Sequence, residues 1–213
     1  MDAYEFEAGL YERLYSFFSE YEFDLLSDKK QFRRPLENGF QNIILSHSSY
    51  ENEHWLEVNM GVRMNAIEHW AQQFLDNRKA YQPDANTAII SVGKFTDNKY
   101  FRYKVVEPED LSFAQEALSQ FMAVQGFDFL DSISSVEAID HIFNEDPHRP
   151  SKYIYNQVHR CFKGLIAAKL NMNPHFMLLM EAYYKYLEKV AAKPDLICKF
   201  DRMASYLLHY SPN

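Results

Sequence analysis

The sequence predicts an α+β protein in which an N-terminal helix and an antiparallel sheet precede an all-helical C-terminal half. Two observations carry this prediction. Apolar residues in several segments of the first half alternate with a period of two, which is typical of strands with one buried face. After residue 106 they recur at helical spacing instead. We therefore expect a sheet of about five or six strands in the first half and helices in the second.

The change of period also sets the predicted domain organisation. We predict a sheet domain over residues 1–106 and a helical region over residues 107–213, packed together as one globule. The polar segment 146–151, DPHRPS, is rich in turn-forming residues and is the best candidate for a linker.

The elements before the centre of the sheet are short. Residues 4–19 predict an opening amphipathic helix. Residues 21–26 predict a short strand and 31–36 a second one, which lies at an edge or ends near Pro35 because proline donates no hydrogen bond to a neighbouring strand. The apolar stripe of the opening helix is Phe6, Leu10, Leu14 and Phe17.

The segment 39–63 is the predicted centre of the sheet. Five polar residues at 48–52 separate its two halves, which predicts a hairpin with a long loop. The second half alternates strictly, so its two faces differ in character. One face carries His54, Leu56, Val58, Met60 and Val62, and the other carries Trp55, Glu57, Asn59, Gly61 and Arg63.

A second hairpin is predicted over residues 87–106. Asp97 and Asn98 fit its two-residue turn, because both residue types tolerate a left-handed backbone. Pairing Thr96 with Lys99 would then place one set of apolar residues on a single face of the sheet. That set is Ile90, Val92, Phe101, Tyr103 and Val105.

Helix signals surround and follow this hairpin. Asn65 is placed to cap a helix, with Glu68 three residues later to complete a capping box. A helix that starts at Pro108 is expected to close at Gly126. Ser134 with Glu137 predicts a short helix, and three further helices with short connections favour antiparallel packing.

Composition narrows the class of protein. Of the 213 residues, 47% are hydrophobic, so we expect a substantial core. The net charge of −8 argues against general affinity for nucleic acid or for anionic membranes. The acidic start is unlike a signal peptide, and no apolar run is long enough to span a membrane. Cys161 and Cys198 lie in helical patterns, and we expect reduced thiols and a cytoplasmic location.

Histidine chemistry is one candidate function. His47 and His54 flank the central loop, and Glu51 or Glu53 could add a third metal ligand. No other motif supplies three spaced ligands, and we expect no metal and no cofactor. Nucleophile elbows and phosphate-binding loops are absent from the sequence, so a small hydrolase or transferase that uses histidine and carboxylate groups is the alternative rather than the favoured function.

The charge distribution offers two further sites. Residues 108–146 contain nine acidic and no basic residues, whereas residues 147–213 contain ten basic and four acidic residues. The basic helices give a third hypothesis, nucleic-acid binding, but their cations are scattered rather than striped and we expect no such partner. The polar face of the sheet gives the favoured hypothesis, a non-catalytic module that binds a protein partner. Its predicted binding residues are Trp55, Glu57, Asn59, Arg63, Arg102 and Lys104.

Several short sequences also carry a family resemblance. Phe32-Arg33, Gly39-Phe40 and the run from Glu57 to Arg63, EVNMGVR, resemble the core of certain uncharacterised bacterial α+β domains. The resemblance covers residues 4–106 and implies a helix followed by an antiparallel sheet in a bacterial cytoplasmic protein. It implies no activity and no site residues, and it does not extend to the C-terminal helices.

Overall fold

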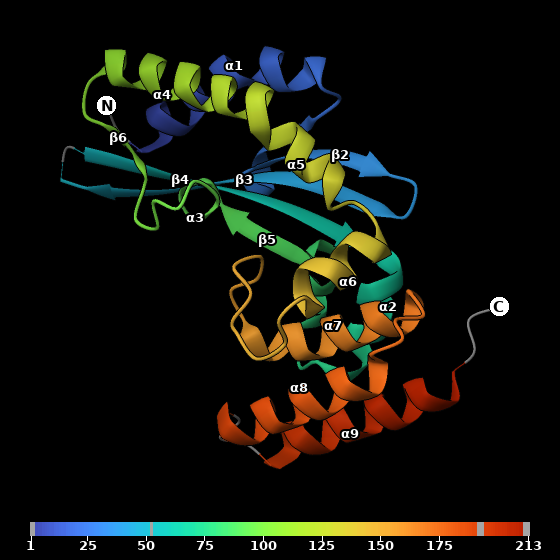
Figure 1. Cartoon of the computed structure of the whole chain (residues 1–213). Helices are drawn as coiled ribbons and strands as arrows, with labels where there is room; N and C mark the ends of the chain where they lie inside the picture. The colour runs from blue at the N-terminus through green and yellow to red at the C-terminus, as the bar shows by residue number, and fades with distance from the viewer. Residues whose placement is uncertain (1–2, 52, 191–193, 211–213) are drawn as a thin grey trace. The chain divides into compact units, whose positions relative to one another are not determined.

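The computed structural model describes residues 3–51, 53–190 and 194–210, which form an α+β structure (Figure 1). A helix precedes a six-stranded sheet, and the described chain beyond residue 106 contains helices and no strand, which confirms the predicted fold class. Two compact units divide the chain. The first contains the described residues up to Val62 together with Ile89–Ser132, and the second contains Arg63–Ala88 and the chain from Ile133 onward. The predicted boundary at residue 106 stays a prediction.

The sheet has the strand order β1-β2-β3-β4-β5, and β6 pairs with β4. The β1–β2, β2–β3 and β4–β6 pairs are antiparallel. A short 3-10 turn, η1 (Ser27–Lys29), joins the first two strands. The strands are β1 (Asp24–Leu26), β2 (Gln31–Leu36), β3 (Gly39–Tyr50), β4 (Glu53–Met64), β5 (Ala88–Ser91) and β6 (Tyr103–Val105).

Strands β3 and β4 form the predicted central hairpin, but its loop is shorter than expected. Both strands have 12 residues, and β3 continues to Tyr50, so the prediction of a five-residue loop is wrong. A hydrogen bond of 2.8 Å between the Ser49 hydroxyl and His54 Nδ1 extends the pairing close to the turn, where Glu51 has a φ of 52°. The apolar face of β4 is buried as predicted at His54, Leu56, Val58, Met60 and Val62.

The core of the first unit lies between the sheet and two helices. Helices α1 (Ala3–Glu20) and α4 (Pro108–Phe121) lie side by side over one face of the sheet (Figure 1). Phe18 completes the buried stripe of α1 in place of the predicted Phe17, because it lies four residues after Leu14. The Phe18 ring packs on Phe32 of β2 at 4.5 Å and, edge-on, on Phe127 at 6.2 Å.

The predicted hairpin over residues 87–106 is wrong. Strand β5 ends at Ser91, whose hydroxyl accepts a hydrogen bond of 3.2 Å from the Lys94 amide and caps the short helix α3 (Val92–Phe95). The chain then crosses to the other half of β4, where β6 pairs in the register Trp55↔Lys104. Asp97 and Asn98 therefore do not form the predicted hairpin turn. The Ser91 cap starts a helix before them, and β6 pairs with β4, a strand far away in sequence.

Gly126 does not close helix α4. The chain continues through a π-helical turn, η3 (Met122–Gly126), into α5 (Phe127–Ser132). A Cβ atom on Gly126 would lie 2.5 Å from Met122 Sδ. Glycine at this position therefore permits a close approach within the helix rather than ending it.

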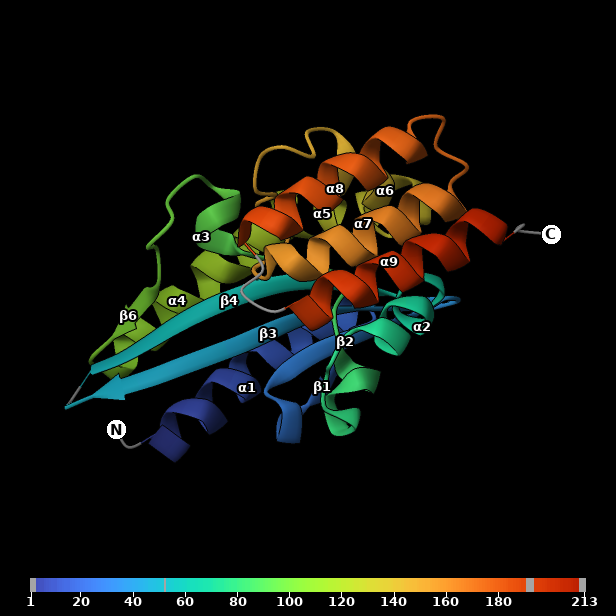
Figure 2. The same cartoon turned by 90° about the horizontal axis from the view of Figure 1, so that it is seen from below.

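Helix α7 (Gln157–Leu170) is the centre of the second unit. It contacts α2, α6, α8 and α9, and the segment from Arg160 to Ala168 is buried. Figure 2 shows α7, α8 and α9 side by side with consecutive helices in opposite directions, as predicted. The other elements are α2 (Asn65–Phe74), the 3-10 segment η2 (Lys79–Asp84), α6 (Val136–Asn144), α8 (Phe176–Val190) and α9 (Pro194–His209).

Two predicted helix caps are wrong. Asn65 Oδ1 accepts a hydrogen bond of 2.8 Å from Arg63 Nε rather than from the backbone of α2, whose N-cap position is Met64. The cap of α6 is Ser135, one residue after the predicted Ser134, and its hydroxyl accepts from the Ala138 amide at 3.0 Å. Glu68 has a buried role instead of a capping role.

A buried ion pair joins α2 to α7. Lys163 Nζ lies 2.7 Å from Glu68 Oε1, and the two side chains are 3% and 0% exposed. The carboxylate also accepts hydrogen bonds from the Thr87 hydroxyl at 3.0 Å and Gln72 Nε2 at 2.7 Å. Lys163 Nζ donates to the Asn86 carbonyl at 2.6 Å. Both charges thus have the additional hydrogen bonds that a buried pair requires.

Arg160 secures the segment that follows α6. Its guanidinium donates to the carbonyls of Phe143 and Asp146 at 2.9 and 2.7 Å, and also to that of Arg149. Arg160 is 3% exposed, so a buried cation holds the start of the candidate linker 146–151 against α7.

Loss of the buried cation should strongly destabilise the fold. We expect Lys163→Met to reduce the free energy of unfolding by about 3–5 kcal/mol, because the charge of Glu68 would remain buried without a cation to compensate it. Urea denaturation measures this change. Lys185→Met is the matched control, since Lys185 pairs with Glu181 at the surface and its loss should change little. Equal stability of the two variants would contradict the assigned role of the buried pair.

The stability of the protein should also fall in acid through His159. Burial and the Lys163 charge lower the pKa of His159 to about 4, while the Glu68 charge opposes them. The unfolded chain has the ordinary value of about 6.5, so it takes up a proton first as the pH falls, and stability is lost between about 6.5 and 4. In thermal melts over this range, His159→Gln should show a shallower loss than the parent. His69 is exposed, so His69→Gln should lose stability with falling pH as steeply as the parent. Identical slopes of melting temperature against pH for the parent and both variants would contradict the prediction.

Candidate functional site

The pocket that contains predicted site residues lies on the sheet face opposite α1. It has a volume of about 620 Å³, and we call it the Trp55 pocket. His54 stacks on Phe6 of α1 at 4.7 Å, so the next side chain along the strand, Trp55, points to the other face. Helix α3 and the loop before β6 border this face in Figure 1. Its lining includes the aromatic residues Tyr50, Trp55, Tyr100 and Phe101 and the charged residues Glu57, Lys94, Lys99 and Arg102.

Strands β4 and β6 bring the charged groups to Trp55. Lys104 lies opposite Trp55 in the sheet, with its ammonium 5.4 Å from the centre of the indole ring, a cation–π distance. The same ammonium lies 2.5 Å from Glu53 Oε1. Arg102 NH2 lies 3.4 Å from Glu57 Oε2. A cation from β6 and another from the loop before it thus lie beside carboxylates from β4.

The loop after α3 places the aromatic residues. The Asn98 amide donates to the Gly93 carbonyl at 2.8 Å, and the Phe101 amide donates to the Asn98 carbonyl at 2.9 Å. A Cβ atom on Gly93 would lie 2.6 Å from the Asn98 oxygen, so only glycine permits this approach. Asp97 takes a left-handed φ of 57°. These contacts fold the loop back on α3 and direct Tyr100 to the pocket.

The aromatic lining is well exposed. Tyr100 is 85% exposed, Tyr50 70% and Phe101 36%, and Trp55 is half-buried. Phe101 is supported from below by an edge contact of 4.8 Å with the ring of Tyr103. Burial raises the pKa of Tyr103 to about 12, so this phenol stays neutral at physiological pH.

The structure brings together four of the six predicted binding residues. Trp55, Glu57 and Arg102 line the pocket and Lys104 lies against Trp55. Asn59 is 7% exposed and offers no surface. Arg63 lies in the second unit, where its guanidinium donates to the carbonyls of Gln82 and Ala85 at 2.8 and 2.9 Å.

Sequence reasoning missed the rest of the lining. It assigned Phe101 to the apolar face of a hairpin and left six other lining residues out of the site: Ser48, Tyr50, Ser91, Lys94, Lys99 and Tyr100. The adjacent aromatic residues Tyr100 and Phe101 were the available signal, because two large rings in a polar loop need a reason to be there.

The predicted histidine pair does meet across the hairpin. The rings of His47 and His54 are 6.2 Å apart. His47 Nδ1 lies 2.7 Å from a carboxylate oxygen of Glu7, which comes from α1, whereas Glu53 pairs with Lys104. Among the residues the structure describes, no group of three His, Cys, Asp or Glu side chains is placed to hold a metal ion.

The Ser49 hydroxyl lies 2.8 Å from His54 Nδ1, which is the separation expected of a nucleophile and its general base. However, His54 is 4% exposed and stacks on Phe6. The buried acid Asp140 does not orient a histidine either: it accepts hydrogen bonds from the amides of Asn144, Asn171 and Asn173.

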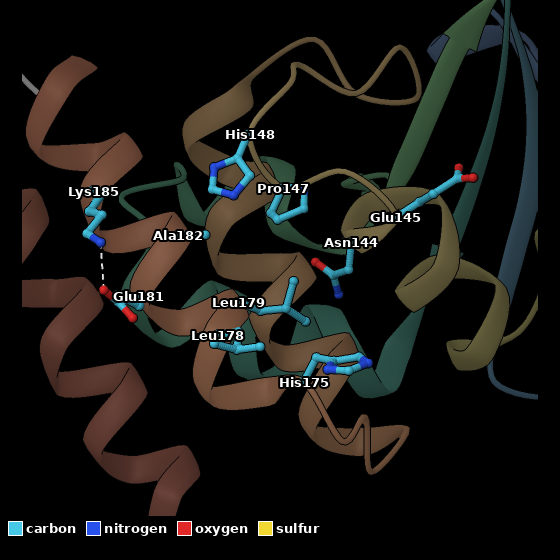
Figure 3. Close-up of a pocket in the computed structure, with 10 residues that line it drawn as sticks. All are labelled: Asn144, Glu145, Pro147, His148, His175, Leu178, Leu179, Glu181, Ala182 and Lys185. Atoms are coloured by element: carbon cyan, nitrogen blue, oxygen red, sulfur yellow. Dashed lines mark hydrogen bonds and ion pairs between the residues drawn. The ribbon is translucent and has the colours of Figure 1, made fainter.

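A second pocket, of about 480 Å³, lies in the second unit between α8 and the segment after α6. Figure 3 shows His148 and His175 on opposite sides of it, with Leu179 and Ala182 between them. Glu181 is paired with Lys185 at 2.6 Å. The lining mixes both signs of charge with apolar side chains and defines no particular ligand.

Comparisons with protein-family models, with curated proteins and with solved structures found no match for this chain. Within the described parts of the chain, no helix combines the length and the apolar character needed to cross a membrane.

Truncation of Trp55 should cost less stability than truncation of the next residue. Leu56 is 0% exposed on the core face, so Leu56→Ala should reduce the free energy of unfolding by about 2–5 kcal/mol. Trp55→Ala should cost less than the roughly 3–5 kcal/mol typical of a buried Trp. Chemical denaturation of both variants checks this, and a cost for Trp55→Ala above that for Leu56→Ala would show that Trp55 belongs to the core.

Proposed function

We propose that this protein is a non-catalytic module that binds a protein partner through the Trp55 pocket. The observation that carries the proposal is the gathering of Trp55, Tyr100 and Arg102 around one surface pocket. Trp, Tyr and Arg are the residue types that most often dominate the binding energy of protein interfaces. Large exposed rings such as that of Tyr100 also lose little conformational entropy on binding, since they have few rotatable bonds.

The hydrolase or transferase alternative has weaker support. The imidazole of its best pair, Ser49 and His54, is buried against Phe6, and neither residue lines the Trp55 pocket. Nucleic-acid binding by the C-terminal helices has less support still. Arg160 and Lys163 are buried, and Lys199 pairs with Asp76 and Asp195, so part of the basic excess is used within the fold.

A bacterial cytoplasmic setting is part of the proposal. It is supported by the sequence resemblance of residues 4–106 and by the two cysteines, which form no disulfide. Cys161 is buried, and burial raises the pKa of its thiol to about 12, which makes it an inert core residue.

The proposal predicts that peptide ligands of this protein depend on the Trp55 pocket. Binders selected from a displayed random-peptide library should bind the parent protein in a fluorescence anisotropy assay. Trp55→Ala and Tyr100→Ala should each weaken their binding by roughly tenfold or more, as for interface residues that carry most of the energy. The folded state of each variant is first verified by its denaturation curve.

Phe113→Ala is the matched control for this experiment. Phe113 is an aromatic residue that is 74% exposed, but it lies on α4 and outside the Trp55 pocket. Its truncation should leave binding unchanged. Peptides that bind Trp55→Ala and Tyr100→Ala as tightly as the parent would refute the assignment of the pocket as the working surface.

A further inference from the structure

We infer that the Trp55 pocket selects an acidic peptide segment with an aromatic anchor, and that Glu57 competes with the segment's carboxylates for Arg102. This inference rests on the proposed function and adds the chemistry of the partner to it. Three observations carry it: the balance of charge in the lining, the geometry of the Arg102–Glu57 contact, and the aromatic walls.

The lining of the pocket is cationic although the chain as a whole is acidic. Lys94, Lys99 and Arg102 border the pocket with one carboxylate, that of Glu57, against a net charge of −8 for the whole protein. Because complementary charge selects partners and accelerates their association, this local reversal of sign favours an anionic ligand.

The contact between Arg102 and Glu57 is loose. Its N–O distance of 3.4 Å exceeds the roughly 2.7–2.9 Å of a charge-assisted hydrogen bond. The two side chains are 50% and 32% exposed, so water screens the pair and it holds Arg102 weakly. A ligand carboxylate could bind the guanidinium with two parallel hydrogen bonds, which the present contact does not make. Glu57 is then an internal competitor that a suitable ligand displaces.

Aromatic walls define the second part of the ligand. Trp55, Tyr100 and Phe101 border a volume of about 620 Å³, which is within the usual range for a small-ligand site. Rings of this kind favour offset or edge contacts with another ring. A single aromatic side chain of the partner fits this requirement and would place its flanking acidic residues beside Arg102 and the lysines.

A peptide fits better than a single-stranded nucleic acid, which would also offer rings and negative charge. Glu53 and Glu57 lie on the same strand as Trp55 and would repel a chain of phosphates on both sides of the indole. The cations Arg102 and Lys104 already contact carboxylates within the fold. The site therefore has the alternating charges that suit separate carboxylates rather than a continuous polyanion.

The test uses Trp55 itself as the probe. The chain has two tryptophans, and Trp70→Phe leaves Trp55 as the only one. Three short synthetic peptides of equal length carry a central phenylalanine flanked by Glu, Gln or Lys, and a single-stranded oligonucleotide serves as the competing class. The Glu-flanked peptide should change the Trp55 fluorescence and bind roughly tenfold tighter than the Gln-flanked one at low salt, with a smaller difference at high salt.

Charge variants of the full chain test the competition. Arg102→Gln should weaken the Glu-flanked peptide several-fold and leave the Gln-flanked peptide unchanged. Glu57→Gln should tighten the Glu-flanked peptide by about threefold, the effect of removing one exposed ion pair. Arg13→Gln and Glu12→Gln are the controls of equal charge change, because both residues are exposed on α1, over the opposite face of the sheet.

The outcomes separate this inference from the proposed function. One outcome is that peptides bind through Trp55 while the Gln-flanked or Lys-flanked peptide binds as tightly as the Glu-flanked one. In that outcome the inference of an acidic ligand is wrong, and the proposed function as a protein-binding module is retained. If Glu57→Gln weakens acidic binding, Glu57 is no competitor and the inference fails. If the oligonucleotide binds through Trp55 in preference to every peptide, both statements about a protein partner are overturned.

Discussion

The first unit depends on the register of strand β4, because one face of this strand is buried in the core and the other lines the surface pocket. One face packs under α1, where His54 stacks on Phe6, and the other carries Trp55 and Glu57 to the pocket. A slip of one residue would exchange the two faces completely. Pairing protects against this slip: β4 has β3 on one side and both β5 and β6 on the other. The geometry of the candidate site is thus set by the same register that buries the core.

The two units use charge in opposite ways. In the second unit, Glu68 and Lys163 are excluded from water, and hydrogen bonds from the Thr87 hydroxyl and to the Asn86 carbonyl support the pair, so it is rigid and costly to break. At the Trp55 pocket, Arg102 and Glu57 remain hydrated and separated by 3.4 Å. Replacing the partner of Arg102 or Glu57 at the pocket therefore costs little free energy, whereas breaking the buried Glu68–Lys163 pair costs a great deal. This contrast favours the pocket, rather than the buried network, as the place where a ligand could bind.

Sequence patterns predicted the features that local periodicity determines. The opening helix, the alternating faces of β4 and the antiparallel C-terminal helices all follow from the spacing of apolar residues. The errors occurred where distant contacts decided the structure. Asp97 and Asn98 fit a hairpin turn, yet β6 pairs with β4, and Glu68 fits a capping box, yet its partner is 95 residues away. For the site, periodicity identified Trp55 and Glu57 on β4. Tyr50 was missed because β3 extends further toward the turn than predicted, and the place of Tyr100 depended on the path of the loop before β6.

The loop between α3 and β6 has a consequence for how this surface could diversify among relatives. It supplies Lys99, Tyr100, Phe101 and Arg102 to the pocket, but none of these four is buried, so their replacement would leave the hydrophobic interior intact. The close approach of Gly93 to Asn98 restricts the path of the loop, and so do its backbone hydrogen bonds and the left-handed Asp97. Under the proposed function, substitutions in this loop would change the preferred ligand while the scaffold stays the same, as with variable loops on a constant framework.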